Sequence, residues 1–275
     1  MNSFGVGRLR SFVAAACATL VLAPAASRAE EWIVTVGGRL GASPPYEGAG
    51  HDDIRPSLMF NVRPADKPYR FTPPDGGSTI ALLSTRYIEL GPMARFRYSR
   101  DDTGKLTGLD KIGIAVEPGV FVNLWPTNWF RIRLEGRRGV TAYQGWVADA
   151  GLDLIHTGKR WDFSIGPRAG YGDHNYMDTY FGVTPQEAAR SPLINIPYDP
   201  RGGQRYLGME VAGSYHVTNR FRTYIDFGYH RLSKGASDSP IVQLAGGARE
   251  DVSASIGASY SFGVNIGRHK QVAWN

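Results

Sequence analysis

Two short groups of residues have the types that metal binding or catalysis would use. His51-Asp52-Asp53 joins an imidazole to two carboxylates, a set that divalent metals accept as ligands. Asp173-His174, with Ser191 or Ser239, has the residue types of a serine hydrolase. Neither signal is specific, because the first group lies where a loop meets a strand and no serine stands in a Gly-x-Ser-x-Gly sequence. We therefore predict no catalytic residues, no metal site and no cofactor.

A third group, of charged residues, is larger and more regular. Arginines and acidic residues alternate with apolar residues, so they share one face of each predicted strand. This predicted interior network comprises Arg95, Arg97, Glu117, Arg131, Arg133, Glu135, Asp149, Asp153, Asp162, Arg168, Glu210 and Asp226. Lys111, Arg137 and Arg222 extend the same face. The two signs are balanced, which favours cross-strand ion pairs over a selectivity ring of one sign or a basic stripe for nucleic acid.

These charged positions lie on strands because the hydrophobic pattern has a period of two. The stretch from Ile112 to Tyr171 shows this period most clearly, over four segments separated by turn residues. The predicted strands span residues 32–42, 53–63, 79–83, 92–98, 112–124, 130–135, 146–154, 161–171, 206–215, 221–230 and 252–262. Residues 69–83 either complete a hairpin, which gives about 12 strands, or remain irregular, which gives 10; we favour 12.

Two features predict which face of the strands is outside. Short connections alternate with long ones, notably 173–203 and 233–247, as in outer-membrane barrels. Aromatic residues mark both strand ends: Trp125, Trp129, Trp161, Tyr215 and Phe221 near the short turns, and Tyr98, Trp146 and Tyr171 near the long loops. A soluble secreted sandwich or lipocalin-like barrel is the alternative, but it has no need of two aromatic girdles. We predict an all-β, antiparallel transmembrane barrel in the outer membrane, with its apolar face in contact with lipid.

The start of the 275-residue chain has the features of a secretory signal peptide. Arg8 and Arg10 precede a short apolar run, and Ser27-Arg28-Ala29 offers small residues for cleavage. The predicted division is a signal peptide at 1–29, a barrel at 30–262 and a polar C-terminal tail at 263–275. Cys17, the single cysteine, falls in the signal peptide, so we expect no disulfide in the mature chain.

Short sequences along the mature chain resemble the MltA-interacting protein/OmpV family of outer-membrane proteins. They are Pro45-Tyr46-Glu47-Gly48, Gly108-Leu109-Asp110-Lys111-Ile112-Gly113, Gly166-Pro167-Arg168, Gly172-Asp173-His174-Asn175-Tyr176, Tyr180-Phe181-Gly182-Val183-Thr184, Ser239-Pro240-Ile241-Val242 and Tyr260-Ser261-Phe262. Their order and spacing, rather than any one of them, define the resemblance. The chain departs from other barrels in that thirteen residues follow the closing aromatic Phe262.

The resemblance implies a structural scaffold for murein (peptidoglycan) synthesis and hydrolysis enzymes. The implied partners are a lytic transglycosylase and a murein polymerase, besides the lipid of the outer membrane. A narrow porin or an adhesin is the alternative, and a lipid-active hydrolase is a third class. The long-loop end offers a candidate recognition surface, formed by Tyr46, Glu47, Asp173, His174, Tyr176, Tyr180 and Phe181. The same residues could instead only pack the loops over the barrel mouth.

Overall fold

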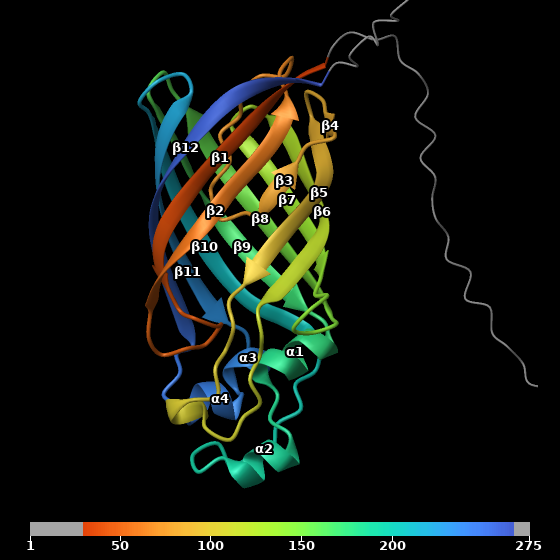
Figure 1. Cartoon of the computed structure of the whole chain (residues 1–275), viewed down its shortest axis with the longest axis vertical. Helices are drawn as coiled ribbons and strands as arrows, with labels where there is room; N and C mark the ends of the chain where they lie inside the picture. Colours follow the sequence, from red (N-terminus) through yellow and green to blue (C-terminus); the bar gives the residue numbers. More distant parts are fainter. Residues whose placement is uncertain (1–29, 267–275) are drawn as a thin grey trace, which may run out of the picture.

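Segments with a period of two form the strands of one closed sheet (Figure 1). The computed structural model describes residues 30–266. Its strands are β1 (Glu30–Ser43), β2 (Asp53–Pro64), β3 (Ser78–Ile80), β4 (Leu83–Ser84), β5 (Ile88–Arg97), β6 (Ala115–Thr127), β7 (Phe130–Arg138), β8 (Trp146–Thr157), β9 (Trp161–Gly172), β10 (Gly203–His216), β11 (Phe221–Leu232) and β12 (Glu250–Ile266). The predicted signal peptide lies outside the described residues. The last strand continues to Ile266, beyond the predicted barrel end at Phe262.

The sheet closes through the short strand β3. Strands β5 to β12 pair with their sequence neighbours, and β1 pairs antiparallel with both β12 and β2. β3 then pairs parallel with β2, at Asn61 and Thr79, and antiparallel with β5, at Thr79 and Met93. A parallel neighbour requires a crossover connection, which residues 65–77 supply. The sheet has the predicted twelve strands, but β4 only extends the edge of β5, so eleven strands form the closed ring.

The apolar face of the sheet is on the outside, as predicted. Ile54 and Leu58 are 74% and 88% exposed, whereas Glu117 and Arg131 on the opposite face are 0% exposed. A barrel with an apolar exterior and a charged interior matches the surface that a lipid bilayer requires. No helix within residues 30–266 is long and apolar enough to span a membrane.

Most of the aromatic residues predicted at the strand ends are exposed, but Tyr215 is half-buried and Trp125 is buried. Trp129 and Trp161 near the short turns, and Trp146 near the long loops, are each more than half exposed. Trp125, by contrast, is 2% exposed and packs inside the barrel against Phe71. Its predicted place in the outer girdle is wrong, because Trp125 has the strand parity of the buried Glu117 rather than that of the lipid-facing residues.

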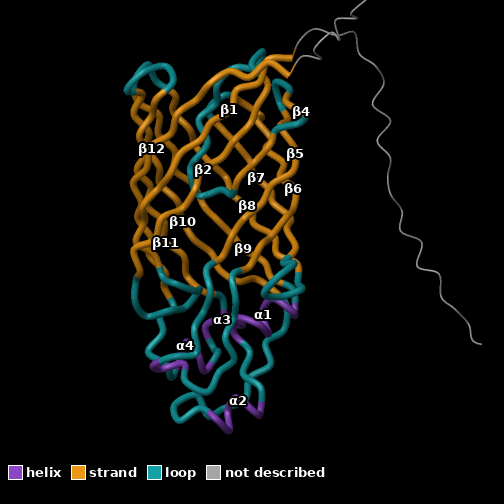
Figure 2. Tube along the Cα trace, in the orientation of Figure 1, coloured by secondary structure: helices purple, strands orange, loops and turns teal. Residues whose placement is uncertain are grey.

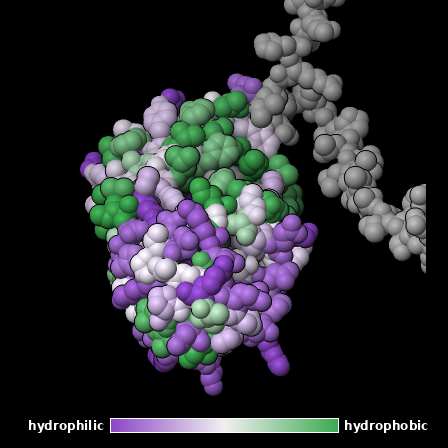
Figure 3. Space-filling model, turned by 60° about the horizontal axis from the view of Figure 1, so that its bottom comes forward, coloured by the Kyte–Doolittle hydropathy of each residue, from purple (hydrophilic) through white to green (hydrophobic). Residues whose placement is uncertain are grey.

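The two ends of the barrel differ. The turn end has the short connections β6–β7, β8–β9 and β10–β11, together with both ends of the described chain (Figure 1). The loop end has a cap built from the long connections, which contain the short helices α1 (His174–Phe181), α2 (Pro185–Arg190), α3 (Lys234–Ser237) and α4 (Pro240–Gln243). Figure 3 brings this end forward and shows hydrophilic residues over it, with hydrophobic residues on the barrel wall behind.

Local hydrogen bonds explain why the long connections contain helices that the strand pattern did not predict. The Asp173 carboxylate accepts a hydrogen bond from the backbone N–H of Tyr176, at 2.9 Å, and so caps α1. Thr184 and Glu187 form a capping box around the start of α2, with Pro185 in its first turn. Apolar side chains of these helices, Phe181 among them, then pack as a small core over the barrel mouth.

Residues 65–77, here called the inward segment, fold into the barrel instead of crossing its rim (Figure 2). The segment begins at the turn end, where the Ala65 N–H donates to the Glu31 carbonyl at 2.8 Å. Phe71 is fully buried against inward side chains of β6, β8 and β10, including Ile155. Asp75 reaches the middle of the interior and contacts Arg168. A lumen that strands alone would leave open is therefore partly filled by backbone.

Candidate functional site

The charged interior is positioned by the register of β7 and β8. Arg131 stands directly opposite Asp153, and Glu135 stands opposite Asp149. Directly opposed side chains on one face are close enough to pair. Arg131 donates from Nε and Nη2 to Asp153 Oδ2, at 2.9 and 2.6 Å, and both side chains are fully buried. The two N–H donors converge on one carboxylate oxygen, and hydrogen bonds between charged groups of this kind are strong.

A group of ion pairs fills the loop-end half of the interior. Arg137 lies between Glu117, Glu135 and Asp149, with its Nε donating to Glu117 at 3.0 Å. Glu117 also accepts hydrogen bonds from Arg97 and from the Tyr143 hydroxyl of the cap, the latter at 2.7 Å. The network thus continues from the barrel wall into the cap.

A second group fills the middle of the barrel and includes the inward segment. Arg168 donates to Asp75 at 2.7 Å and to Asp153 at 2.8 Å. Arg95 donates to Glu135 at 3.1 Å and to the backbone carbonyl of Asp75 at the same distance. Arg133 also pairs with Glu135. Through Arg168 of β9 and Arg95 of β5, these contacts fix the inward segment to two strands of the wall.

The remaining predicted interior residues lie apart from these two groups. Asp162 is 2.6 Å from Nε2 of His216 and accepts a hydrogen bond from Tyr69 of the inward segment. Asp226 accepts from Arg39 at 3.3 Å. Glu210 is buried and forms no ion pair within residues 31–265. All twelve residues of the predicted network therefore point into the barrel, but they form separate clusters.

One predicted interior residue is on the surface. The Lys111 side chain is 61% exposed and pairs with Asp101 in the cap. The strand predicted to begin at Ile112 begins only at Ala115, and Ile112 instead forms a bridge with Arg100 in the loop. The placement of Lys111 was wrong because the alternation of apolar residues begins at Ile112, three residues before β6 itself begins.

Three charged residues that form ion pairs in the interior were missed from the sequence. Arg205 is 1% exposed and donates to Asp149 at 2.6 Å while pairing with Glu47. A register shift between Gln204 and Tyr206 turns it inward, and a period of two does not predict a bulge. Asp75 and Arg39 complete the set: the former lies in an irregular segment, and the latter is surrounded by glycines in β1.

The residues of the predicted recognition surface lie mostly in the packing of the cap. Tyr176, Tyr180 and Phe181 are at most 4% exposed, so they cannot form an accessible surface, and that part of the prediction is wrong. Tyr46 packs against the core of the cap, and Asp173 caps α1. Of the remaining two, His174 is exposed and Glu47 points inward to Arg97 and Arg205. Aromatic residues in a loop indicated packing rather than recognition.

Glu47 joins the cap to the barrel wall through two ion pairs. Its Oε1 accepts from Arg97 Nη1 at 3.1 Å and also contacts Arg205. Burial disfavours the ionised carboxylate, but Arg205 and Arg97 outweigh it and hold the pKa of Glu47 below its usual value. The loop between β1 and β2 is thereby tied to β5 and β10.

The two groups with catalytic or metal-binding residue types are dispersed. His51 is largely exposed and its Nε2 is 3.9 Å from Asp53. Within the described residues there is no group of three or more His, Cys, Asp or Glu side chains that could hold a metal ion. Ser239 donates to the Phe181 carbonyl at 2.6 Å, and the hydroxyl of Ser191 accepts from the Ile194 N–H. His174 forms no hydrogen bond to either serine within residues 31–265; its Nδ1 contacts the Pro200 carbonyl instead.

The chain is similar to one protein family and to several solved outer-membrane proteins. A family model described as MltA-interacting protein MipA matches residues 36–262. An outer membrane channel from Pseudomonas putida F1 is 11% identical, with 86% of this chain and 97% of that chain covered and a TM-score of 0.39. The NanC porin is 13% identical, with 83% and 98% covered and a TM-score of 0.37.

The outer membrane protease OmpT from Escherichia coli is 10% identical, with 85% of this chain and 95% of that chain covered and a TM-score of 0.30. A search of the curated proteins gave no match.

Proposed function

The chain belongs to the MltA-interacting protein MipA family, and from this premise we propose that it is a scaffold for murein enzymes, built on a barrel whose interior is closed. It is an outer-membrane β-barrel, and the family description names an interaction with MltA, a lytic transglycosylase. The proposed partners are a lytic transglycosylase of this kind and a murein polymerase. The proposed role is to hold them at the membrane, without catalysis by the barrel itself.

The filled interior is the observation that supports a scaffold over a pore. Arg137 and Arg168 each bridge carboxylates of different strands, and Arg168 also holds Asp75 of the inward segment. Long, ion-paired arginines in a ring of eleven strands leave little continuous space. A cavity of about 300 Å³ at the turn end and one of about 390 Å³ among the cap loops share no lining residue. A barrel filled in this way suits attachment better than transport.

The turn end is the proposed docking side for the partners. In outer-membrane barrels the short turns face the periplasm, where murein lies, and the long loops face outward. The turn end exposes residues of three turns, among them Asn128, Lys159 and Asn219. Because the rigid barrel fixes the relative positions of these turns, they form one surface for a folded partner.

Site-specific photo-crosslinking in intact cells tests this proposal. A photoreactive amino acid replaces Asn128 or Asn219 at the turn end, and Gln186 of α2 at the loop end serves as the matched exposed control. Mass spectrometry identifies the crosslinked proteins after purification of the barrel from the envelope. We expect a lytic transglycosylase and a murein polymerase at Asn128 or Asn219 and neither at Gln186.

Two outcomes would contradict the scaffold proposal. The absence of murein enzymes at both turn-end positions, in cells where the enzymes are present, would remove the proposed partners. Crosslinks to the same enzymes from Gln186 alone would place any interaction on the wrong side of the membrane. Recovery of the transglycosylase without the polymerase would refute the two-partner form of the scaffold.

A further inference from the structure

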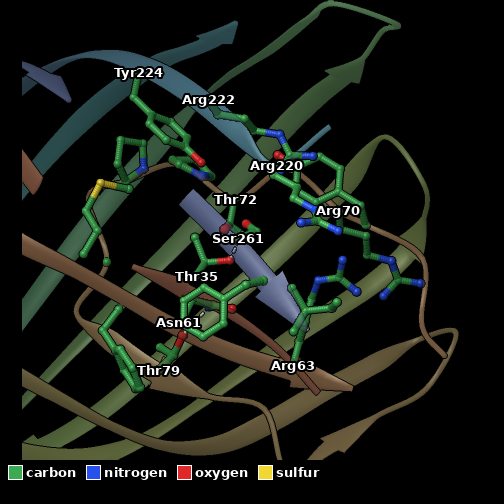
Figure 4. Close-up of a pocket in the computed structure, with 18 of the residues that line it drawn as sticks. Thr35, Asn61, Arg63, Arg70, Thr72, Thr79, Arg220, Arg222, Tyr224 and Ser261 are labelled. Carbon is green, nitrogen blue, oxygen red and sulfur yellow. Dashed lines mark hydrogen bonds between the residues drawn. The ribbon is translucent and has the colours of Figure 1, made fainter. Parts of the chain in front are cut away.

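A basic cavity lies at the turn end, between the inward segment and the ends of β1, β2, β11 and β12 (Figure 4). Its volume is about 300 Å³. Its charged lining consists of one acid, Glu31, and five arginines: Arg63, Arg70, Arg133, Arg220 and Arg222. Figure 4 shows Arg63, Arg70, Arg220 and Arg222 gathered at one side of this cavity, although they come from distant parts of the chain.

The arginines of this cavity differ from those deeper in the barrel in how they are neutralised. Arg131, Arg137 and Arg168 each contact at least one carboxylate. Among the cavity arginines only Arg133 does, through Glu135. The other four form no ion pair within residues 31–265. Positive charge is therefore concentrated and uncompensated at this place, unlike in the balanced interior network.

Contacts with neutral groups hold three of these side chains in position. Arg63 donates from Nη1 to the carbonyls of Pro64 and Lys67, at 3.3 and 2.8 Å. Arg70 lies over the Trp125 ring, with its guanidinium carbon 4.8 Å from the ring centroid. The corresponding distance from Arg222 to the Tyr69 ring is 3.7 Å. Carbonyls and aromatic rings orient a guanidinium without neutralising its charge.

Unused donors remain on these side chains. Nε of Arg222 is buried and has no hydrogen-bond partner within residues 31–265. A buried donor without an acceptor costs about 1–3 kcal/mol, so a ligand acceptor there would be favoured.

The acidic residues nearest to the cavity arginines either already have hydrogen-bond partners or lie at the rim of the barrel. Glu89 accepts a hydrogen bond from Asn123 at 2.9 Å, and Asp162 is 2.6 Å from His216. Glu31 is exposed at the rim of the barrel. The cavity thus combines several preoriented cations with no buried acid of its own.

We propose that this cavity binds a small, multiply charged anion through carboxylate or phosphate groups. The planar guanidinium fork matches both groups with two parallel hydrogen bonds, and several forks select for more than one negative charge. Hydroxyl groups of Thr35, Thr72 and Ser261 also line the cavity and can bind further oxygen atoms. The cavity volume corresponds to roughly ten water molecules, which fits a ligand the size of pyrophosphate or citrate. The site is independent of the scaffold role and stands even if no murein enzyme binds.

Isothermal titration calorimetry on the full mature barrel, in nanodiscs of zwitterionic lipid, tests the proposal. Inorganic pyrophosphate and citrate are the two probes. We expect saturable binding of at least one probe, weakened by added salt because the contacts are between charges. Binding of pyrophosphate alone identifies a phosphate ligand, and binding of citrate alone identifies a carboxylate ligand; binding of both assigns their shared chemistry to the site.

Variants locate the binding in the cavity. Arg63→Gln and Arg222→Gln should each weaken binding about tenfold or more, the typical effect of losing a hydrogen bond between charged groups. Arg220→Gln serves as a third test because Arg220 is exposed, so its loss should not affect folding. Lys159→Gln removes the same charge from an exposed turn outside the cavity, and its affinity should stay within about twofold of wild type, as expected for a remote exposed charge.

Three results would overturn the proposal. One is the absence of measurable heat with either anion at about 10 mM, far above the range in which several charged contacts act together. A second is wild-type affinity in the folded arginine variants. The third is a loss of affinity in Lys159→Gln as large as in Arg222→Gln, which would show that only the overall charge matters.

Discussion

The contact between Asp75 and Arg168 provides a sharp test of how the interior is held. Arg168 Nε donates to Asp75 Oδ2 at 2.7 Å, and the two side chains are 7% and 24% exposed. Removing Asp75 leaves Arg168 paired with Asp153 at 2.8 Å, so the arginine is not left as an isolated charge. The full cost of breaking a buried pair, about 3–5 kcal/mol, is therefore not expected. The loss should be that of one hydrogen bond between charged groups, about 1.5–3 kcal/mol.

A double-mutant cycle with Asp75→Asn and Arg168→Met isolates this contact. The four proteins are unfolded in urea from lipid vesicles and followed by tryptophan fluorescence, to which Trp125 beside the inward segment contributes. We predict a coupling free energy of about 1.5–3 kcal/mol. The exposed pair Asp66 and Lys67, at 2.7 Å, is the control and should give at most about 1 kcal/mol. A coupling below about 0.5 kcal/mol for Asp75 and Arg168 would refute the view that ion pairs hold the inward segment.

Three further predictions concern the wall, the cap and the closure of the ring. Leu152→Arg on the lipid-facing wall should lower the free energy of unfolding by about 2–4 kcal/mol in vesicles. Val140→Arg in the cap is the control and should change it little. Equal effects of the two substitutions would mean that the lipid-facing and interior faces are misassigned. Because the pKa of Glu47 is lowered on folding, its stabilisation of the cap should be present above pH 4.5 and lost as the pH falls through the lower folded-state pKa. Proteolysis of the loops should therefore speed up in acid in the wild type, and Glu47→Gln should cleave rapidly at neutral pH as well. Gly77→Val should cost about 1–3 kcal/mol in urea unfolding, because its Cβ would collide with the Ala94 carbonyl beside β3, whereas Gly113→Val has open space and should be neutral.

The barrel wall was predictable because its pattern is local. On β8, Leu152 and Leu154 alternate with Gly151 and Asp153, and one face of such a strand must meet lipid while the other meets the interior. Residues of the network, such as Arg131 and Asp153, followed from the same alternation. Their burial is set by strand parity alone, so no knowledge of distant contacts was needed.

The features that were not predicted depend on contacts between distant segments. Nothing near Asp75 in the sequence indicates that its partner is Arg168, and the pattern of residues 69–83 fits either a hairpin or an irregular segment. Arg205 turned inward through a bulge, which has no signal in the alternation. The basic cavity likewise needs the inward segment to bring Arg70 beside Arg222.

The cap shows a signal that was present and overlooked. Thr184-Pro185-Gln186-Glu187 is a capping box with proline in the first turn, a recognisable helix start. Residues 184–187 were predicted as part of a loop because the segments on either side of the connection had the pattern of strands. Asp173 is likewise the N-cap of α1, and an amphipathic helix over the barrel mouth accounts for the burial of Tyr176 and Phe181.

Single-channel recording in planar bilayers tests the closed interior most directly. Purified barrel, reconstituted alone, should give no stable conductance steps, because ion-paired arginines such as Arg137 and Arg168 and the inward segment occupy the lumen. Asp75→Asn should likewise give no stable conductance steps, since Arg95 still donates to the backbone carbonyl of residue 75 at 3.1 Å. Large, long-lived conductance steps from the wild-type barrel would contradict the account and make this protein a channel.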